Sequence, residues 1–115
     1  MATAAGRIWT LAGGLDYAGK PRPALILQDD RFDATESITV CPFTTDPTAT
    51  EVMRLAIEPD ETNGLRTACC LMVDKIITVP KNKIGRRIGR LDMADMGRLG
   101  RAVVVFLGAA DAIGA

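Results

Sequence analysis

Short apolar runs separated by turn-forming residues fill the first 91 positions of the chain, and this pattern predicts a fold built mainly of β-strands. The runs are rich in residues such as Val, Ile and Thr that favour extended structure. Clusters of Gly, Pro, Asp and Asn separate them. We predict strands at residues 7–11, 24–28, 38–41, 52–57, 67–73, 76–79 and 84–91.

Three of these segments and one loop carry more specific expectations. Residues 24–28 form an unbroken apolar run, which is typical of a strand buried on both faces. The strand at 38–41 is expected to end within residues 42–45 (PFTT), and polar residues 29–37 are expected to form a loop with one helical turn. Gly85 and Gly89 weaken the prediction of a strand at 84–91, because glycine has no side chain to pack there.

A helix is expected after residue 91. Asp92 can cap its first turn, and Asp95 lies near the positive end of the helix dipole. Gly97 and Gly100 each lower helix stability by about 1 kcal/mol relative to Ala, and Gly108 predicts the C-terminal end. The expected buried face repeats at intervals of three and four positions and consists of Met96, Leu99, Val103, Phe106 and Leu107.

Together these elements predict one mainly β domain over residues 1–115, with a core at about 6–108. Six or seven short strands followed by one amphipathic helix favour a curled antiparallel sheet or small barrel, with the helix covering an open side. The chain is 48% hydrophobic, which is enough for one core. A domain of this size still buries a modest share of its surface, so we expect a homodimer.

The cysteine and histidine content argues against disulfides and against a zinc site. Cys41, Cys69 and Cys70 are odd in number and two of them are adjacent, and the chain has no histidine. Small buried thiols in a reducing cytosol are the expected state. The sequence has neither an apolar run long enough to span a bilayer nor a signal peptide, so we expect a cytoplasmic protein. We also expect that it uses no metal and no cofactor.

The lack of histidine also excludes Ser-His-Asp triads and Cys-His pairs. The chain carries no phosphate-binding loop and no dinucleotide-binding glycine fingerprint. Charge is uneven: residues 1–74 hold 6 Lys/Arg and 11 Asp/Glu, a net charge of −5, whereas residues 75–115 hold 8 and 3, a net charge of +5. This asymmetry permits a basic surface for an anionic partner.

Arg22 is the most distinctive candidate for such chemistry. It lies between Pro21 and Pro23 at the mouth of the most apolar strand, and the two prolines restrict the local backbone. Its guanidinium offers a planar fork of donors that suits a phosphate. The alternative is a surface arginine paired with a nearby carboxylate.

Other candidates flank this segment. Thr44 and Thr45 end a strand, where hydroxyls can bind an anion or satisfy a turn. Asp16 and Asp74 are the nearest acids. Residues 81–90 hold five cations and no acid, a run that can bind phosphates or form a solvated face.

Four segments in order resemble the MazF/PemK (Kid) family of toxin endoribonucleases, over residues 6 to about 107. They are residues 6–9 (GRIW), 18–30 (AGKPRPALILQDD), 40–45 (VCPFTT), and 73–79 with 84–91 (VDKIITV and IGRRIGRL). The resemblance implies an SH3-like barrel of the CcdB/Kid type with a terminal helix, acting as a homodimer. It also implies sequence-selective cleavage of single-stranded RNA, and inhibition by a cognate antitoxin whose disordered tail covers the RNA groove.

By the same resemblance, Arg22 falls on the family's catalytic arginine and Thr44 on its catalytic threonine, while Asp16 stands where many members carry a glutamate. The loop before Arg22 is one residue longer than usual. Met72 stands where one branch of the family has a second arginine. The residues expected to bind RNA are Tyr17, Lys20, Thr45, Asp74, Lys75, Arg86 and Arg87.

The expected reaction is internal transesterification, in which the RNA 2′-hydroxyl attacks the neighbouring phosphorus and leaves a 2′,3′-cyclic phosphate and a 5′-hydroxyl. Arg22 and Thr44 would stabilise the extra negative charge. An unperturbed Asp has a pKa near ~3.9, so Asp16 either becomes a base through burial or only orients Arg22.

Two alternatives come from other functional classes. One is a CcdB-like toxin that binds DNA gyrase without catalysis, a mode that relies on a tryptophan near the end of the terminal helix. The only tryptophan here is Trp9. The other alternative is a catalytically silent relative that binds RNA or a protein partner.

Overall fold

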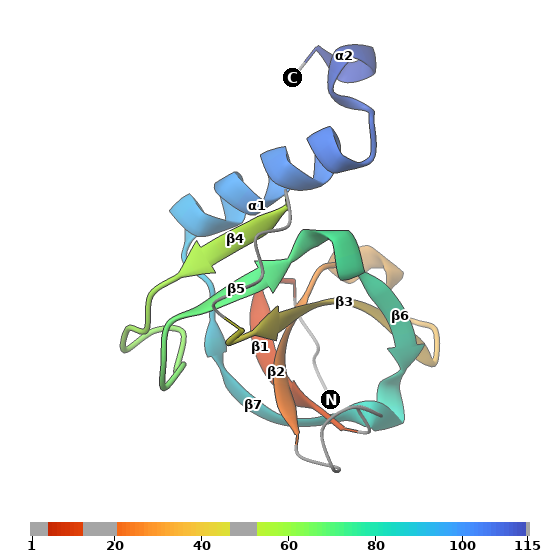
Figure 1. Ribbon diagram of the computed structural model, residues 1–115. Helices are drawn as coiled ribbons and strands as arrows, with labels where there is room; N and C mark the ends of the chain where they lie inside the picture. The colour runs from red at the N-terminus through yellow and green to blue at the C-terminus, as the bar shows by residue number, and fades with distance from the viewer. Residues whose placement is uncertain (1–4, 13–20, 47–52, 115) are drawn as a thin grey trace.

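The computed structural model describes residues 5–12, 21–46 and 53–114, which form seven antiparallel strands and two C-terminal helices (Figure 1). The strands are β1 (Arg7–Leu11), β2 (Arg22–Ile26), β3 (Ser37–Thr44), β4 (Arg54–Ile57), β5 (Cys69–Met72), β6 (Ile77–Pro80) and β7 (Ile84–Arg90). Single 3₁₀ turns precede β3, β6 and β7, namely η1 (Asp30–Phe32), η2 (Val73–Lys75) and η3 (Lys81–Lys83). The helices are α1 (Met93–Phe106) and α2 (Ala110–Ile113). This order confirms the predicted mainly β class with a terminal helix.

Strand β3 lies at the centre of the sheet because it pairs with three other strands. Along one edge it pairs with β2, with Ala24 opposite Pro42. Along the other edge its first half pairs with β6 and its last two residues pair with β5. The order of the sheet is β4-β5-β3-β2-β1-β7, with β6 beside β3. Figure 1 shows how β6, β3, β2, β1 and β7 curl into a small barrel, while β4 and β5 extend beneath α1.

The third strand ends at Thr44, inside the predicted segment 42–45, so it runs through Pro42. Proline cannot donate a backbone hydrogen bond and usually interrupts a central strand. Here Pro42 stands between the part of β3 that pairs with β6 and the part that pairs with β5. The proline therefore falls where the ladder on that edge already changes partner.

Side chains along the central strands point alternately to the two faces of the sheet, and so they form two apolar clusters, one on each face. Ile8, Leu25 and Cys41 point into a cluster that also contains Leu99 of α1. Their neighbours point to the other side, into a cluster inside the barrel made of Trp9, Ala24, Ile26, Ile38, Val40 and Ile84. Ala24, Leu25 and Ile26 are all fully buried, which confirms the expected strand buried on both faces.

The loop between β4 and β5 is held by the side chain of Asn63, which is 2% exposed. Its Oδ1 accepts hydrogen bonds from the backbone N–H groups of Asp60 (3.1 Å) and Leu65 (3.0 Å), and its Nδ2 donates to the Glu58 carbonyl (2.8 Å). The loop packs so closely on β7 that a Cβ at Gly89 would lie 2.5 Å from the Asn63 carbonyl oxygen. Glycine thus weakens β7 as a strand but permits this contact.

Both predicted ends of the main helix are confirmed. The Asp92 side chain accepts a hydrogen bond from the Asp95 N–H at 2.8 Å, which satisfies one of the free donors of the first turn. Gly108 has a φ of +74°, the left-handed conformation that ends many helices. None of the described helices is both long and apolar enough to cross a membrane.

The predicted buried face of this helix is only partly correct. Leu99 is fully buried, and Met96 and Val103 pack partly against the core. Phe106 and Leu107 are 45% and 67% exposed, so their assignment to the buried face is wrong for the single chain. Figure 1 shows the reason: the C-terminal end of α1 and all of α2 project beyond the sheet.

Leu99 and its neighbour Gly100 give a test of this packing. Leu99→Ala should lower the free energy of unfolding by about 2–4 kcal/mol, because it opens a cavity in the core. Gly100→Ala should raise it by up to about 1 kcal/mol, since a Cβ at Gly100 would meet nothing within 4 Å. Urea unfolding of the two variants and the parent measures both values. Equal effects of the two substitutions would contradict the packing of α1.

Candidate functional site

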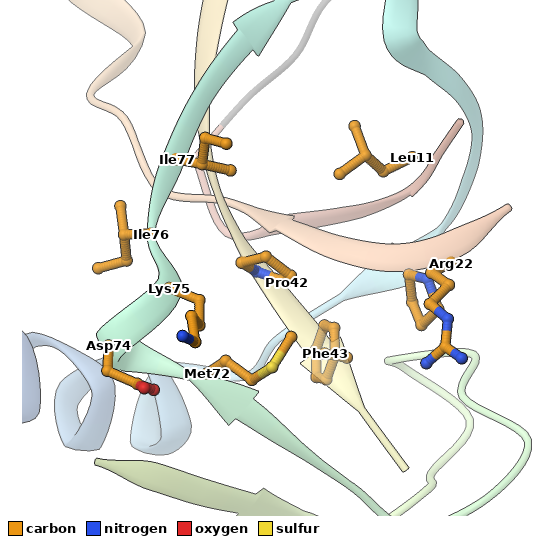
Figure 2. Close-up of a pocket in the computed structure, with 10 residues that line it drawn as sticks. Leu11, Arg22, Pro42, Phe43, Met72, Asp74, Lys75, Ile76 and Ile77 are labelled. Carbon is orange, nitrogen blue, oxygen red and sulfur yellow. The ribbon is translucent and has the colours of Figure 1, made fainter. Parts of the chain in front are cut away.

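Arg22 is the first residue of β2, opposite Leu11 of β1. Pro23 pushes the backbone of Arg22 toward the extended form that a strand requires. The half-buried Arg22 side chain lines a cavity of about 670 Å³ where β1, β2 and β3 meet η2 and β6, which we call the Arg22 pocket (Figure 2). Its other lining residues are Leu11, Pro23, Pro42, Phe43, Met72, Asp74, Lys75, Ile76 and Ile77.

The two residues expected to catalyse the reaction lie on adjoining strand ends. The last pair of the β2–β3 ladder is Ala24 with Pro42, and Arg22 and Thr44 each lie two residues beyond it, where they would be opposite if the register continued. Arg22 lines the Arg22 pocket and Thr44 does not. Residues opposite each other in an antiparallel pair project to the same face. Thr44 is 7% exposed, and its Oγ1 accepts a hydrogen bond from the Asp46 N–H at 3.2 Å. The hydroxyl therefore satisfies a turn and keeps its own hydrogen to donate.

Asp74 and Lys75 form the opposite end of the Arg22 pocket, as Figure 2 shows. Asp74 is paired with Arg54 of β4: Arg54 Nη2 donates a hydrogen bond to Asp74 Oδ2 at 3.3 Å, and Nε lies 3.0 Å from Oδ1. This second contact lacks hydrogen-bond geometry and is an ion pair only. The two side chains are 11% and 21% exposed, so the charge of Asp74 is fixed in position.

Arg54 was not expected to take part in the site. The sequence did contain a signal, because Arg54 is the one charged residue in the apolar stretch from Val52 to Ile57. A buried charge needs a partner of opposite sign, so an arginine in a half-buried strand indicates an acid nearby. Nothing in the sequence identified that acid as Asp74.

A second cavity, of about 700 Å³, lies on the other side of the start of β2, and we call it the loop pocket. Two residues expected to bind RNA, Thr45 and Arg86, line it. Arg66 and Thr67 of the β4–β5 loop also line it, although no feature of the sequence singled them out. The remaining lining residues are Thr10, Pro21, Pro23, Leu65, Cys69 and Gly85.

The structure thus divides the expected RNA-binding residues between two pockets. Arg87 lines neither of them. Asp16, Tyr17 and Lys20 lie outside the described residues. In the basic run 81–90, Lys81 Nζ lies 3.0 Å from Asp33 Oδ1, so this cation serves an internal ion pair.

The thiols are not positioned for chemistry. Cys41, Cys69 and Cys70 are free; the first two are buried and Cys70 is partly exposed, much as expected. Burial raises the pKa of Cys41 to about 12, with a further increase from the Asp74 carboxylate, and burial raises the pKa of Cys69 to about 11. Both therefore stay protonated near neutral pH and are poor nucleophiles. Within the described residues, no group of three His, Cys, Asp or Glu side chains gathers in a metal-binding arrangement.

The chain is similar to known toxins over almost its whole length. Residues 4–107 match the family described as PemK-like, MazF-like toxin of type II toxin–antitoxin system. A relative from Mycolicibacterium smegmatis, a probable endoribonuclease MazF, is 53% identical over 105 residues, which cover 91% of this chain and 96% of the relative.

Solved structures share the fold at lower identity. An endoribonuclease in complex with its cognate antitoxin, from a mycobacterial species, has a TM-score of 0.72 and 22% identity, covering 93% of this chain and 94% of that one. The MazE–MazF structure (Form-III) from Deinococcus radiodurans has a TM-score of 0.76 and 16% identity, covering 94% and 98%. These likenesses confirm the expected small-barrel architecture.

The Arg54–Asp74 pair can be tested by a double-mutant cycle. Removing either partner leaves a largely buried charge alone, so the single Ala variants and the double variant should reveal a coupling energy of about 1–2 kcal/mol. The matched control is the Arg31–Asp29 pair, which has the same 3.0 Å separation but side chains that are 81% and 49% exposed. Its coupling should stay below about 0.5 kcal/mol. Equal couplings for the two pairs would show that burial of the Arg54–Asp74 pair has no energetic consequence.

Proposed function

Because the chain belongs to the PemK-like, MazF-like family of type II toxins and is an endoribonuclease, we propose that it cuts single-stranded RNA by attack of a 2′-hydroxyl on the neighbouring phosphorus. The nucleophile then belongs to the substrate. The protein needs only to bind the strand, move one proton and stabilise charge on the phosphate. These tasks suit a chain without histidine.

The observation that supports this proposal is the position of Arg22 and Thr44 at the adjoining ends of β2 and β3, each two residues beyond the Ala24–Pro42 pair. A guanidinium and a hydroxyl at neighbouring strand ends can donate to two oxygens of the same phosphate. Both side chains belong to strands whose cores are fully buried, so their backbones are fixed before RNA binds. Fixed donors stabilise developing charge without a cost of reorganisation.

The chemical step follows from these positions. As the 2′-oxygen bonds to phosphorus, its proton leaves to a base and the nonbridging oxygens gain negative charge. The Arg22 guanidinium stabilises that charge, and the Thr44 hydroxyl donates to a second oxygen while it accepts from the Asp46 N–H. The 5′-oxygen then leaves and takes up a proton. Asp16 is our candidate for the base or for the group that orients Arg22.

The Arg22 pocket is proposed to hold the nucleotide beside the scissile phosphate. Its walls are mostly apolar, which suits the faces of a base, and the Asp74 carboxylate can accept hydrogen bonds from a base amino group. Lys75 is exposed at the same end and can contact a phosphate. Thr45, Arg86 and Arg87, which are also proposed to contact RNA, do not line this pocket, and Tyr17 and Lys20 lie outside the described residues.

We further propose that the toxin is a cytoplasmic homodimer under the control of a cognate antitoxin. The mycobacterial structure with the same fold contains a cognate antitoxin. Exposed apolar side chains at the end of α1 and in α2 provide surface for protein contacts: Val105, Phe106, Leu107 and Ile113. Three free thiols fit a reducing compartment, and the cytoplasm holds the mRNA substrate.

Arg22→Ala should reduce the rate of RNA cleavage by about 100- to 1,000-fold, because one fixed donor to the transition state contributes about 3–4 kcal/mol. The assay is single-turnover cleavage of end-labelled RNA, with thermal unfolding to verify that the variant is folded. Arg31→Ala, which removes an exposed arginine from the Asp29 ion pair, is the control and should cleave normally. A folded Arg22→Ala protein with the parental rate would overturn the role of Arg22.

The parent protein should cleave RNA equally well with and without EDTA, since the proposed step uses no metal. Its products should carry 2′,3′-cyclic phosphates and 5′-hydroxyls, which mass spectrometry of short substrates can identify. Strict dependence on Mg²⁺, or products with 5′-phosphates, would refute the transesterification. Absence of any cleavage would point to the silent or gyrase-binding alternatives.

A further inference from the structure

The loop pocket carries positive charge with no acid among its described lining residues. Arg66 from the β4–β5 loop and Arg86 from β7 contribute the charge. Neither arginine forms an ion pair within the described part of the chain. Three hydroxyls, from Thr10, Thr45 and Thr67, line the same cavity. This combination of guanidinium and hydroxyl donors matches the oxygens of a phosphate and its ribose.

The loop pocket adjoins the Arg22 pocket across the start of β2. Side chains alternate along a strand, so Arg22 and Pro23 point to opposite faces. Pro23 lines both pockets, and Pro21 lines only the loop pocket. Pro23 therefore forms the rim between the pockets, and its neighbour Arg22 lines the Arg22 pocket beside it. A flexible strand whose phosphate contacts Arg22 can place its next nucleotide over this rim.

The loop that supplies Arg66 is fixed in place before any ligand binds. Asn63 bonds the loop backbone from inside, and the Arg90 N–H donates to the Thr62 carbonyl at 3.0 Å, which ties the loop to β7. Gly64 adopts a φ of +69°, and a Cβ there would lie 2.4 Å from the Ile88 carbonyl oxygen. On the opposite wall, the Arg86 N–H donates to Thr10 Oγ1 at 2.8 Å. Such preorganisation lowers the entropic cost of binding.

We propose that the loop pocket binds the phosphate of a nucleotide next to the cut site, with Arg66 and Arg86 as its cationic contacts. This assignment rests on the proposed cleavage of single-stranded RNA and adds a second subsite to it. An acidic peptide would also be attracted to the charge. The three hydroxyls and the contiguity with Arg22 favour the nucleic acid.

The test measures binding separately from cleavage. After the cleavage sequence is mapped, an RNA of that sequence carrying a 2′-O-methyl group at the cut site serves as an uncleavable probe. Arg66→Ala should weaken its Kd by about tenfold at low salt and make the slope of log K against log[salt] shallower by about 0.7, the loss of one phosphate contact. The control is Arg101→Ala, which removes an exposed arginine of α1 that lines neither pocket.

Neutral methylphosphonate groups, placed at one phosphate of the probe at a time, identify the contact. One position should weaken binding to the parent protein and have little further effect on Arg66→Ala, because the partner charge is already gone. If Arg66→Ala binds every probe as tightly as Arg101→Ala does, the subsite is refuted. It is also refuted if, at every position, the loss of binding caused by the methylphosphonate adds to the loss caused by Arg66→Ala. If Arg66→Ala weakens only the binding of an acidic peptide, the pocket belongs to a protein partner. If the parent cuts no RNA, the proposed function is refuted before the probe is made, whereas a parent that cuts RNA together with normal binding by Arg66→Ala refutes the subsite alone.

Discussion

The backbone pairing of β3 is the interaction on which the rest of the molecule depends. This strand joins β2 on one edge and both β6 and β5 on the other, so it connects the barrel to the pair of strands that lies under α1. Its side chains alternate between the two apolar clusters, with Val40 in one and Cys41 in the other. A shift of register by one residue would exchange the two clusters. The same shift would turn the side chain of Thr44 to the opposite face of the sheet.

The site inherits its geometry from this arrangement. Arg22 begins a strand whose next residues are buried on both faces, and Thr44 ends the strand that pairs with it. The residues proposed to carry the chemistry thus lie at strand ends, where side chains can reach a ligand while the backbone stays in the sheet. Asp74 is positioned differently, through an ion pair with Arg54 on β4. The buried Asn63 has the corresponding role for the loop that carries Arg66.

Local physical signals were sufficient to predict most of the fold. Runs of β-forming residues between turn clusters located all seven strands, and Asp92 and Gly108 located the ends of α1. The errors involved tertiary context. Phe106 and Leu107 fit the helical repeat, but the sheet does not extend far enough to cover them.

The candidate site was less predictable for the same reason. Arg22 and Thr44 were identified by a local motif and a family resemblance, and they lie at the adjoining ends of β2 and β3. The pairing of Arg54 with Asp74 joins positions twenty residues apart and has no local signature. The contribution of the β4–β5 loop depends on how it packs against β7. The need for a glycine at position 89 is visible only in the folded structure, where a Cβ would collide with this loop.

The pairing of β1 with β7 has a consequence for the synthesis of this protein in the cell. Arg7 lies opposite Arg90, so one of the first strands to leave the ribosome must wait for one of the last elements before its ladder is complete. Closing contacts this distant in sequence is slow compared with forming a local hairpin. Completion of the barrel therefore depends on a long-range pairing that no local hairpin can replace. The rate at which the toxin reaches its folded form should be set by this step.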